Sequence, residues 1–321
     1  MTTIARMIAL CAALFVSGPA SAQQYPNKPV RILIPFAAGG VSDIAGRLIA
    51  QKLSERLGQQ FYVENQPGAG GNLGMGNAAR AGGDGYTILL SSSSYVVNPS
   101  LYNKVTYDAE KDFVPVTKAG ASPNSWLVHP DFPAKTMKEM IDLIKSQPGK
   151  HSVASPGTGT TPSLSIEMLK LALGLDFVTV PFSGGGPSTQ SILAGHTPIG
   201  CGALGNAVNL IKEGKLRALA VTAKKRAAAM PEVPTMEELG IKGQEAETMQ
   251  GVFVPAGTPQ AIVELLQREI AAIVRLPDVK EKLISLGVEP EGNSSAEFTE
   301  YIKAEIAKWK KVIEDAKINK I

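Results

Sequence analysis

The sequence predicts an α/β fold of two domains, each built on a mainly parallel sheet. Short apolar segments alternate with longer segments in which apolar residues recur every three or four positions, the pattern of strands that alternate with helices. A chain of 321 residues is more often two domains than one. With 44% apolar and 19% charged residues, its composition is that of an ordinary globular protein.

Residues 1–22 are expected to be a signal peptide. Arg6 supplies a positive start, residues 7–16 are apolar, and Ala20 and Ala22 form an A-x-A cleavage site. No later apolar run is long enough to span a membrane. We therefore expect cleavage after Ala22 and export of the mature protein.

The next segment is expected to run from a strand at 30–34, through a glycine loop at 37–40, into a helix that ends before Gly58. Ser42 is the expected N-cap of this helix. A glycine loop that leads into a helix N-terminus is suited to binding an anion, because free N–H groups and the helix dipole meet there. Asp43 has two possible roles. Its negative charge stabilises the positive end of the helix dipole, or its carboxylate accepts a hydrogen bond from a ligand.

The following elements are assigned by the same periodicity. A strand at 61–64 and a short helix at 73–80 precede a strand at 86–90, which ends in a run of serines at 91–94. Residues 103–130 look irregular, and we expect the first crossing between domains there.

The second domain is expected to repeat the strand–loop–helix design twice. These units span 152–163, with Thr161 as N-cap, and 177–187, with Pro187 opening the helix. The other elements expected from here on are a helix at 135–146, strands at 199–203, 216–222 and 251–255, a helix that ends near Gly214 and a return linker at 223–234. Two closing helices follow, the first opened by Pro259 and the second capped by Ser295.

Signals for an enzyme are weak. The common nucleophile, zinc and phosphate-loop motifs are absent, and a G-x-G-x-x-A match at 74–79 lacks the strand that should precede it. His129, His151 and His196 have no carboxylate at metal-ligand spacing, and Cys201 lies in an apolar strand. We expect no metal, no cofactor and no catalysis, with a secreted hydrolase as the alternative.

The three glycine loops, at 35–43, 155–163 and 181–190, contain no Lys or Arg. Glycine in any one of them is explained by turn geometry, but three such loops favour a shared site at the ends of strands. Recognition by N–H groups, hydroxyls and helix ends suits reversible capture of a carboxylate. A formal net charge of +3 gives no reason to expect nucleic-acid or membrane binding.

Several motifs resemble one protein family, the substrate-binding proteins of tripartite tricarboxylate transporters (TctC/Bug). One is Pro-Phe-Ala-Ala-Gly-Gly-Val-Ser-Asp at 35–43, and another is Val-Pro-Phe-Ser-Gly-Gly-Gly-Pro at 180–187. The other matching segments are 25–32, 65–71, 98–102, 215–222, 231–235 and 255–259. The chain departs from the family pattern at Ser165, in residues 191–195, and at Met249 and Gln250.

The resemblance implies a periplasmic binding protein of the two-lobe, type II (flytrap) kind. Lobe 1 would comprise 23–123 and 226–321 and lobe 2 would comprise 124–225, with hinges near 120–125 and 224–250. The ligand would be a small carboxylate, either a diacid or an aromatic acid. The receptor would be a monomer that delivers this ligand to integral membrane transporter subunits; an alternative role is to present it to a sensor protein.

The resemblance also places the ligand in the cleft between the lobes, against four groups of residues. The expected ligand-binding residues are Phe36, Ala37, Ala38, Gly39, Gly40, Ser42, Asp43, Ser91, Ser92, Ser93, Gly157, Thr158, Gly159, Thr160, Thr161, Phe182, Ser183, Gly184 and Ala203.

Overall fold

The computed structural model describes residues 25–315 and 317–321. The signal peptide and its cleavage after Ala22 lie outside these residues. No helix in the described part of the chain is long and apolar enough to cross a membrane.

The described elements follow one another in a mixed α/β order. The strands are β1 (Val30–Ile34), β2 (Phe61–Asn65), β3 (Thr87–Ser91), β4 (Phe113–Val128), β5 (Ser152–Ser155), β6 (Val178–Pro181), β7 (Ile199–Ala203), β8 (Arg217–Val221), β9 (Glu247–Pro255) and β10 (Glu289–Pro290). The helices are α2 (Val41–Leu57), η1 (Ala69–Gly71), α3 (Asn72–Ala79), α4 (Ser94–Leu101), α5 (Met137–Ser146), α6 (Thr161–Leu173), α7 (Gly185–Leu193), η2 (Leu204–Asn206), α8 (Val208–Lys212), α9 (Gln260–Arg275), α10 (Pro277–Ser285) and α11 (Ser295–Asp315).

The strands pair in the order β2-β1-β3-β9-β4-β7-β5-β6, with β8 and β10 beside β4. Pairing is parallel among β1, β2 and β3 and among β5, β6 and β7, as the alternation of strands and helices predicts. Every pair that involves β4 or β9 is antiparallel. These two strands carry the chain between the two parallel groups. A crossover connection, usually a helix, is needed only between strands that pair in parallel, so it does not constrain β4 and β9.

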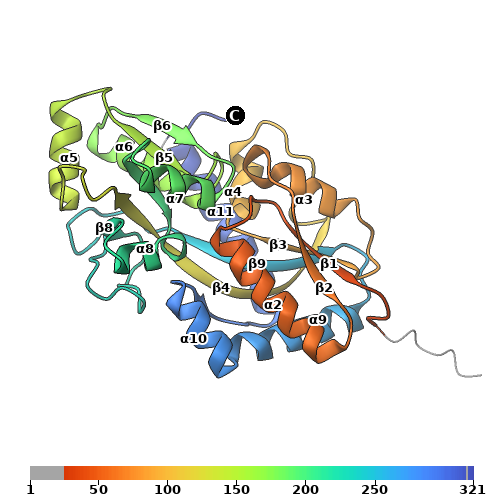
Figure 1. Ribbon diagram of the computed structural model, residues 1–321. Helices are drawn as coiled ribbons and strands as arrows, with labels where there is room; N and C mark the ends of the chain where they lie inside the picture. The colour runs from red at the N-terminus through yellow and green to blue at the C-terminus, as the bar shows by residue number, and fades with distance from the viewer. Residues whose placement is uncertain (1–24, 316) are drawn as a thin grey trace, which may run out of the picture.

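The long strand β4 joins the two lobes. One part of it pairs with β9 and β10, and the other part pairs with β7 and β8. Figure 1 shows β4 and β9 running side by side through the middle of the molecule, with β1–β3 at one end and β5–β7 at the other. The fold is therefore the two-lobe α/β arrangement that the resemblance implies.

The expectation of an irregular stretch at 103–130 is wrong for β4. Pro115 and Pro123 break the strand signal in the sequence, because proline cannot donate to a ladder and is rare inside sheets. The structure accommodates Pro115 beside a shift of register in the β4–β9 pairing.

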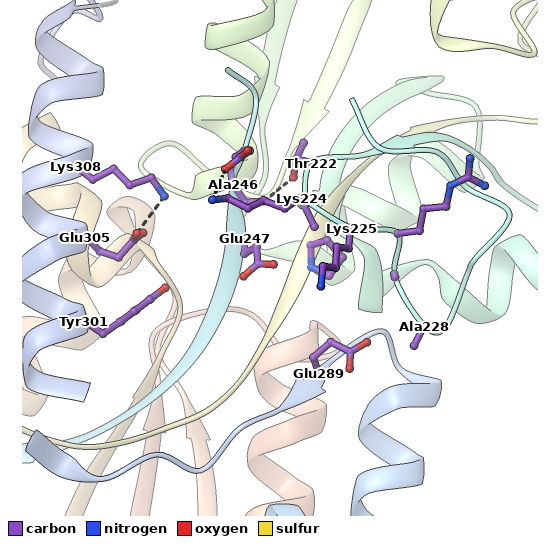
Figure 2. A pocket seen from close by; sticks show the side chains of 15 residues that line it. Thr222, Lys224, Lys225, Ala228, Ala246, Glu247, Glu289, Tyr301, Glu305 and Lys308 are labelled. Atoms are coloured by element: carbon purple, nitrogen blue, oxygen red, sulfur yellow. Dashed lines mark hydrogen bonds and ion pairs between the residues drawn. The ribbon is translucent and has the colours of Figure 1, made fainter. Parts of the chain in front are cut away.

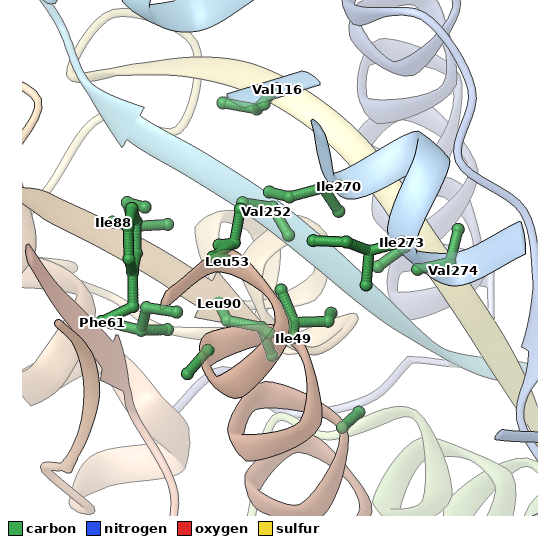
Figure 3. Close-up of a cluster of buried hydrophobic side chains, with 14 of the residues drawn as sticks. Ile49, Leu53, Phe61, Ile88, Leu90, Val116, Val252, Ile270, Ile273 and Val274 are labelled. Atoms are coloured by element: carbon green, nitrogen blue, oxygen red, sulfur yellow. The ribbon is translucent and has the colours of Figure 1, made fainter. Parts of the chain in front are cut away.

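Two apolar clusters cover opposite faces of the lobe 1 sheet. Val252 belongs to the cluster under α2 and α9, with Ile49 and Ile270, as Figure 3 shows. The next residue on β9, Phe253, belongs to the other cluster, with Tyr95 of α4 and Phe298 of α11. Side chains alternate along a strand, so β9 contributes to both clusters at once. In lobe 2, Trp126 of β4 lies among buried residues of α5 and α6.

Several helix starts differ from the expected ones by one or two residues. The N-cap of α2 is Gly40, whose carbonyl accepts from the Ile44 N–H, so Ser42 lies inside the first turn and does not cap. Thr160, not Thr161, caps α6, and its hydroxyl oxygen accepts from the Ser163 N–H at 3.4 Å. Helix α7 begins at Gly185, ahead of Pro187.

The C-terminal part of lobe 1 holds more elements than the two closing helices expected. Between α9 and α11 the chain forms α10, opened by Pro277, and the short strand β10. The cap of α11 is Ser294 and not Ser295: its hydroxyl accepts from the Glu297 N–H, and the Glu297 carboxylate accepts from the Ser294 N–H. This is a capping box, in which two free N–H groups are satisfied reciprocally. A further helix absent from the sequence assignment is α4, which directly follows β3.

Replacing Phe298 with Ala should destabilise the protein by about 3–5 kcal/mol, because the ring is fully buried and anchors α11 on Phe253, with ring centroids 5.2 Å apart. Urea unfolding followed by circular dichroism measures the change. Tyr62→Ala is the control, since Tyr62 is 41% exposed. A loss no larger than that of the control would contradict this account of the core.

Candidate ligand-binding site

The loop between β1 and α2 directs its backbone N–H groups into the space between the lobes. Gly39 has φ of +83°, a left-handed conformation that favours glycine, and it turns the chain into α2. Because the cap residue Gly40 has no side chain, it supplies no acceptor to the first turn of the helix. Those N–H groups must bond to another part of the molecule or to a ligand.

Asp43 stabilises the first turn of α2. One of its carboxylate oxygens accepts from the Gly39 N–H at 3.0 Å and from Arg47 Nε at 3.1 Å. Burial alone would raise the pKa of this carboxyl, but hydrogen bonds from Arg47 and Gly39 outweigh it and hold the pKa below its ordinary value. These contacts use the carboxylate within α2 and the loop that precedes it, which favours a role for Asp43 in stabilising the start of the helix.

Lobe 2 approaches this loop through the glycines that open α7. A Cβ atom on Gly184 would lie 3.2 Å from the Ala37 nitrogen, and one on Gly186 would lie 2.9 Å from the Ala38 carbonyl oxygen. The glycine run therefore permits contact between the two backbones. The expectation that this run also helps to hold an anion stays a prediction.

Two hydrogen bonds cross from the first loop to lobe 2. The Ala37 N–H donates to the Ser183 carbonyl at 3.3 Å, and the Val41 N–H donates to Oδ1 of Asn206 at 2.7 Å. Asn206 ends η2, directly after β7. The lobes are thus in contact, and the structure is a closed one.

A small cavity remains between the lobes. Its volume is about 40 Å³, which holds water but not a ligand of several carbon atoms. It is lined by Phe36, Ala37, Gly40, Val41, Ser42, Asp43, Ser92, Pro156, Thr160, Pro162, Gly185, Ala203, Asn206 and Thr248.

The cavity brings together expected ligand-binding residues from the first loop, the serine run, the second loop and β7. Phe36, Ala37, Gly40, Ser42, Asp43, Ser92, Thr160 and Ala203 are expected residues that line it. Ala38, Ser183 and Gly184 lie instead at the contact between the lobes. Expected residues that do not line the cavity also include Gly39, Ser91, Ser93, Gly157, Thr158, Gly159, Thr161 and Phe182.

Some of these other residues have structural contacts. The hydroxyls of Ser93 and Thr161 both donate to the Glu247 carbonyl, at 2.9 and 3.1 Å. The Thr158 carbonyl accepts from the Tyr102 hydroxyl at 3.2 Å, a further contact between the lobes. Ser91 is buried, and its hydroxyl faces the Met75 sulfur.

Six lining residues are absent from the set of expected ligand-binding residues. Four of them, Val41, Pro156, Pro162 and Gly185, lie within the glycine loops at 35–43, 155–163 and 181–190, which the sequence favours as a shared site. Asn206 and Thr248 are single polar residues outside any loop motif, and the signal that could have found them is their position beside the ends of two strands.

A polar network lies beside the cavity. Oγ1 of Thr248 donates to Oδ1 of Asn124 at 2.8 Å and lies 3.2 Å from Oγ1 of Thr161. Gln250 is two residues further along β9, on the same face as Thr248, and is fully buried. Its amide oxygen and nitrogen have no hydrogen-bond partner among the described residues. A buried amide without a partner is costly, which marks this position as unusual.

The electrostatics of the cavity come from backbone groups. Asp43 is the one charged residue among those that line it, and Arg47 pairs with it at 3.0 Å. The starts of α2, α6 and α7 all contribute lining residues, and helix N-termini carry partial positive charge. The cavity is therefore suited to an anion of modest charge, held without a cationic side chain.

A larger groove, of about 510 Å³, lies elsewhere along the hinge. Glu247 of β9, Glu289 of β10 and Tyr301 of α11 contribute to its walls, as Figure 2 shows. Glu247 and Thr248 are adjacent in β9 and project from opposite faces of the strand, so the groove and the small cavity are on opposite sides of it. None of the three glycine loops lines this groove, which argues against it as the site that they form.

The remaining candidates do not form a reactive site. No group of His, Cys, Asp and Glu that could hold a metal is found in the described part of the chain. Cys201 is fully buried, and burial raises the pKa of its thiol. A protonated, inaccessible thiol is a poor nucleophile.

Comparison with known proteins identifies the family. The model of the tripartite tricarboxylate transporter family receptor, TctC, matches residues 45–318. The chain belongs to this family. It is a periplasmic solute-binding receptor of the TctC/Bug type, a family of binding proteins and not of enzymes.

Three solved structures of similar proteins show the same fold. The periplasmic binding protein BugD is 33% identical, with a TM-score of 0.89 over 92% of this chain and 100% of its own. A protein of R. palustris solved with adipate is 32% identical, with a TM-score of 0.89 over 92% and 100% of the two chains. MatC of Rhodopseudomonas palustris, solved with malate, is 32% identical, with a TM-score of 0.86 over 90% and 100%.

Replacing Asp43 with Asn should lower the free energy of unfolding by about 1 kcal/mol at neutral pH, through the lost charge beside Arg47 and the helix end. The folded-state pKa of Asp43 is lowered, so its stabilising effect is full above the unfolded-state pKa and is lost as pH falls through the folded-state value. Urea unfolding of both proteins between pH 7 and pH 3 should therefore show a difference that shrinks on acidification. A difference that grows at low pH would contradict this reading.

Gly186→Ala should keep the ligand-free protein from closing fully. The added Cβ would meet the Ala38 carbonyl oxygen at 2.9 Å, while the helical backbone at residue 186 accepts Ala readily. Small-angle X-ray scattering should give a larger radius of gyration for the variant than for the wild type. Gly202→Ala is the matched control in lobe 2, because a Cβ there meets no atom within 4 Å. Equal radii for all three proteins would remove the glycine run from the closure contact.

Proposed function

We propose that this receptor captures a small carboxylate, a diacid or an aromatic acid, in the cleft between its lobes and delivers it to an integral membrane transporter. The observation that carries the proposal is the convergence of the α2, α6 and α7 N-termini on one cavity that lacks a free cationic side chain. Backbone N–H groups at helix ends bind carboxylates, whereas tight phosphate or nucleotide binding usually adds Lys or Arg.

Two of the similar structures support this class of ligand. They contain adipate and malate, both of them small dicarboxylates. The unpartnered amide of Gln250, near the cavity on β9, offers a donor and an acceptor for a second polar group. We infer that the carboxylate binds at the first loop, through N–H groups of residues 37–42, and that its far end meets hydroxyls such as that of Ser92.

Ligand entry requires the lobes to separate, because the cavity of about 40 Å³ is too small for a diacid. We propose that lobe 1 comprises 23–123 and 226–321 and that lobe 2 comprises 124–225, so that β4 and the segment before β9 serve as the hinge. The ligand shifts the equilibrium toward a closed, filled form to the extent that it binds that form more tightly.

Thermal unfolding of residues 23–321 in the presence of carboxylates tests this proposal. The panel contains adipate, malate, citrate, shorter and longer aliphatic diacids, nicotinate, and mono- and dicarboxylated benzenes. A ligand at 100 times its Kd stabilises by about 2.7 kcal/mol, and we expect the midpoint to rise by at least about 2 °C for a few members of the panel.

Two controls make the result specific. The amide or methyl ester of an active acid should have no effect, since the proposed contacts recognise the carboxylate charge. A panel without any shift, from protein verified to be free of bound ligand by denaturation and mass spectrometry, would refute carboxylate capture.

A further inference from the structure

We propose that Asn206 is a closure latch that a ligand carboxylate displaces. Its Oδ1 accepts from the Val41 N–H at 2.7 Å, and Val41 is the first residue of α2. The inference rests on the proposed function, because the Val41 N–H is one of the groups proposed to bind the ligand carboxylate. In the ligand-free receptor this N–H bonds to Asn206 Oδ1 instead, and that bond helps to keep the lobes closed.

The latch spans the two lobes. Asn206 belongs to η2, and its partner is 165 residues away in the sequence. Val41 is the first residue of α2, and its N–H is one of the four at the helix start that have no carbonyl partner within the helix. An asparagine oxygen is one of the best acceptors for the first turn of a helix, and here it comes from the opposite lobe.

The surroundings of Asn206 hold its side chain in this position. A Cβ on Gly185 would lie 2.1 Å from Nδ2 of Asn206, so glycine makes room for the amide beside the start of α7. A Cβ on Gly205 would lie 2.2 Å from the Leu286 carbonyl oxygen, so the preceding residue permits η2 to approach lobe 1. Glycine at both positions therefore leaves room for Asn206 beside the first loop.

The latch and a ligand compete for one donor. An N–H group at 2.7 Å from one oxygen does not bond a second oxygen equally well, so a carboxylate that reaches Val41 must displace Asn206. The bond therefore stabilises the empty closed form and is absent from the filled one. Its strength lowers the apparent affinity for the ligand.

The test compares Asn206→Ala with the matched control Asn209→Ala, whose side chain is exposed on the neighbouring helix α8. Without ligand, Asn206→Ala should have a radius of gyration shifted toward that of Gly186→Ala, and the control should match the wild type. A net hydrogen bond of ordinary strength corresponds to about a twofold to tenfold change in the ratio of closed to open forms.

The affinity measurement gives the sign of the effect. Adipate, malate and citrate are titrated by calorimetry into each variant, and Asn206→Ala should bind the active acid as tightly as the wild type or up to about tenfold more tightly. Asn206→Asp keeps the shape and adds a negative charge at the helix end, so it should stay compact and bind about tenfold more weakly.

Either of two results would overturn the latch. An unchanged radius of gyration for ligand-free Asn206→Ala shows that the contact does not hold the lobes together. Weaker binding by Asn206→Ala shows that Asn206 contacts the ligand instead of yielding to it. The scattering comparison needs no ligand, so it decides on the contact even if no carboxylate binds and the proposed function fails.

Discussion

The structure depends on one strand that is shared by both lobes. β4 is 16 residues long and pairs with β9 and β10 in lobe 1 and with β7 and β8 in lobe 2. Because its hydrogen bonds belong to both sheets, the lobes cannot fold as separate bodies on a loose linker. Asn124 of β4 also bonds to Thr248 of β9 and to Ser165 of α6, which ties the strand to the polar residues beside the cavity. Relative motion of the lobes is thereby confined to a bend at this strand and its neighbour.

Above this hinge, glycine determines how closely the lobes approach. Backbone of the first loop meets backbone at the start of α7, with no side chain between them at Gly40, Gly184 and Gly186. Such an interface contains N–H and carbonyl groups at short range, and hydrogen bonds cross it from Ala37 and Val41 to lobe 2. Apolar contacts also cross between the lobes, because Ala203 of β7 and Leu164 of α6 belong to the two clusters that cover the lobe 1 sheet.

Local sequence was sufficient to predict most of the elements and the family, because strands such as 30–34 and 199–203 are short, mainly apolar runs that follow a proline. It was insufficient where the signal was not local. Strand β4 was not predicted because it contains Pro115 and Pro123, which are rare inside sheets. The strand forms through pairing with segments that are distant in the sequence, such as β9. Cap positions were displaced by one or two residues, since Gly40, Thr160 and Ser294 are the caps and not Ser42, Thr161 and Ser295.

The candidate site was predictable to the extent that it lies in loops with a recognisable pattern. Residues 36–43, Ser92 and Thr160 line the cavity or adjoin it because each follows the carboxyl end of a strand. Asn206 and Thr248 lie outside these loops, and their partners are distant in the sequence: Asn206 bonds to Val41 of α2, and Thr248 bonds to Asn124 of β4. The glycine run at 184–186 was recognised in the sequence as a loop motif. Its contact with Ala37 and Ala38 of the first loop could not be predicted, because that contact depends on how the two lobes meet.

The burial of Cys201 has a practical consequence for studies of this receptor in solution. It is the one cysteine in the described part of the chain, it is fully buried in β7, and its thiol is protonated at neutral pH. A thiol-directed dye or spin label would therefore leave the native protein unmodified at this position. A cysteine introduced on the surface of each lobe would then be labelled selectively. Single-molecule distance measurements between the two labels could follow opening and closing without a signal from Cys201.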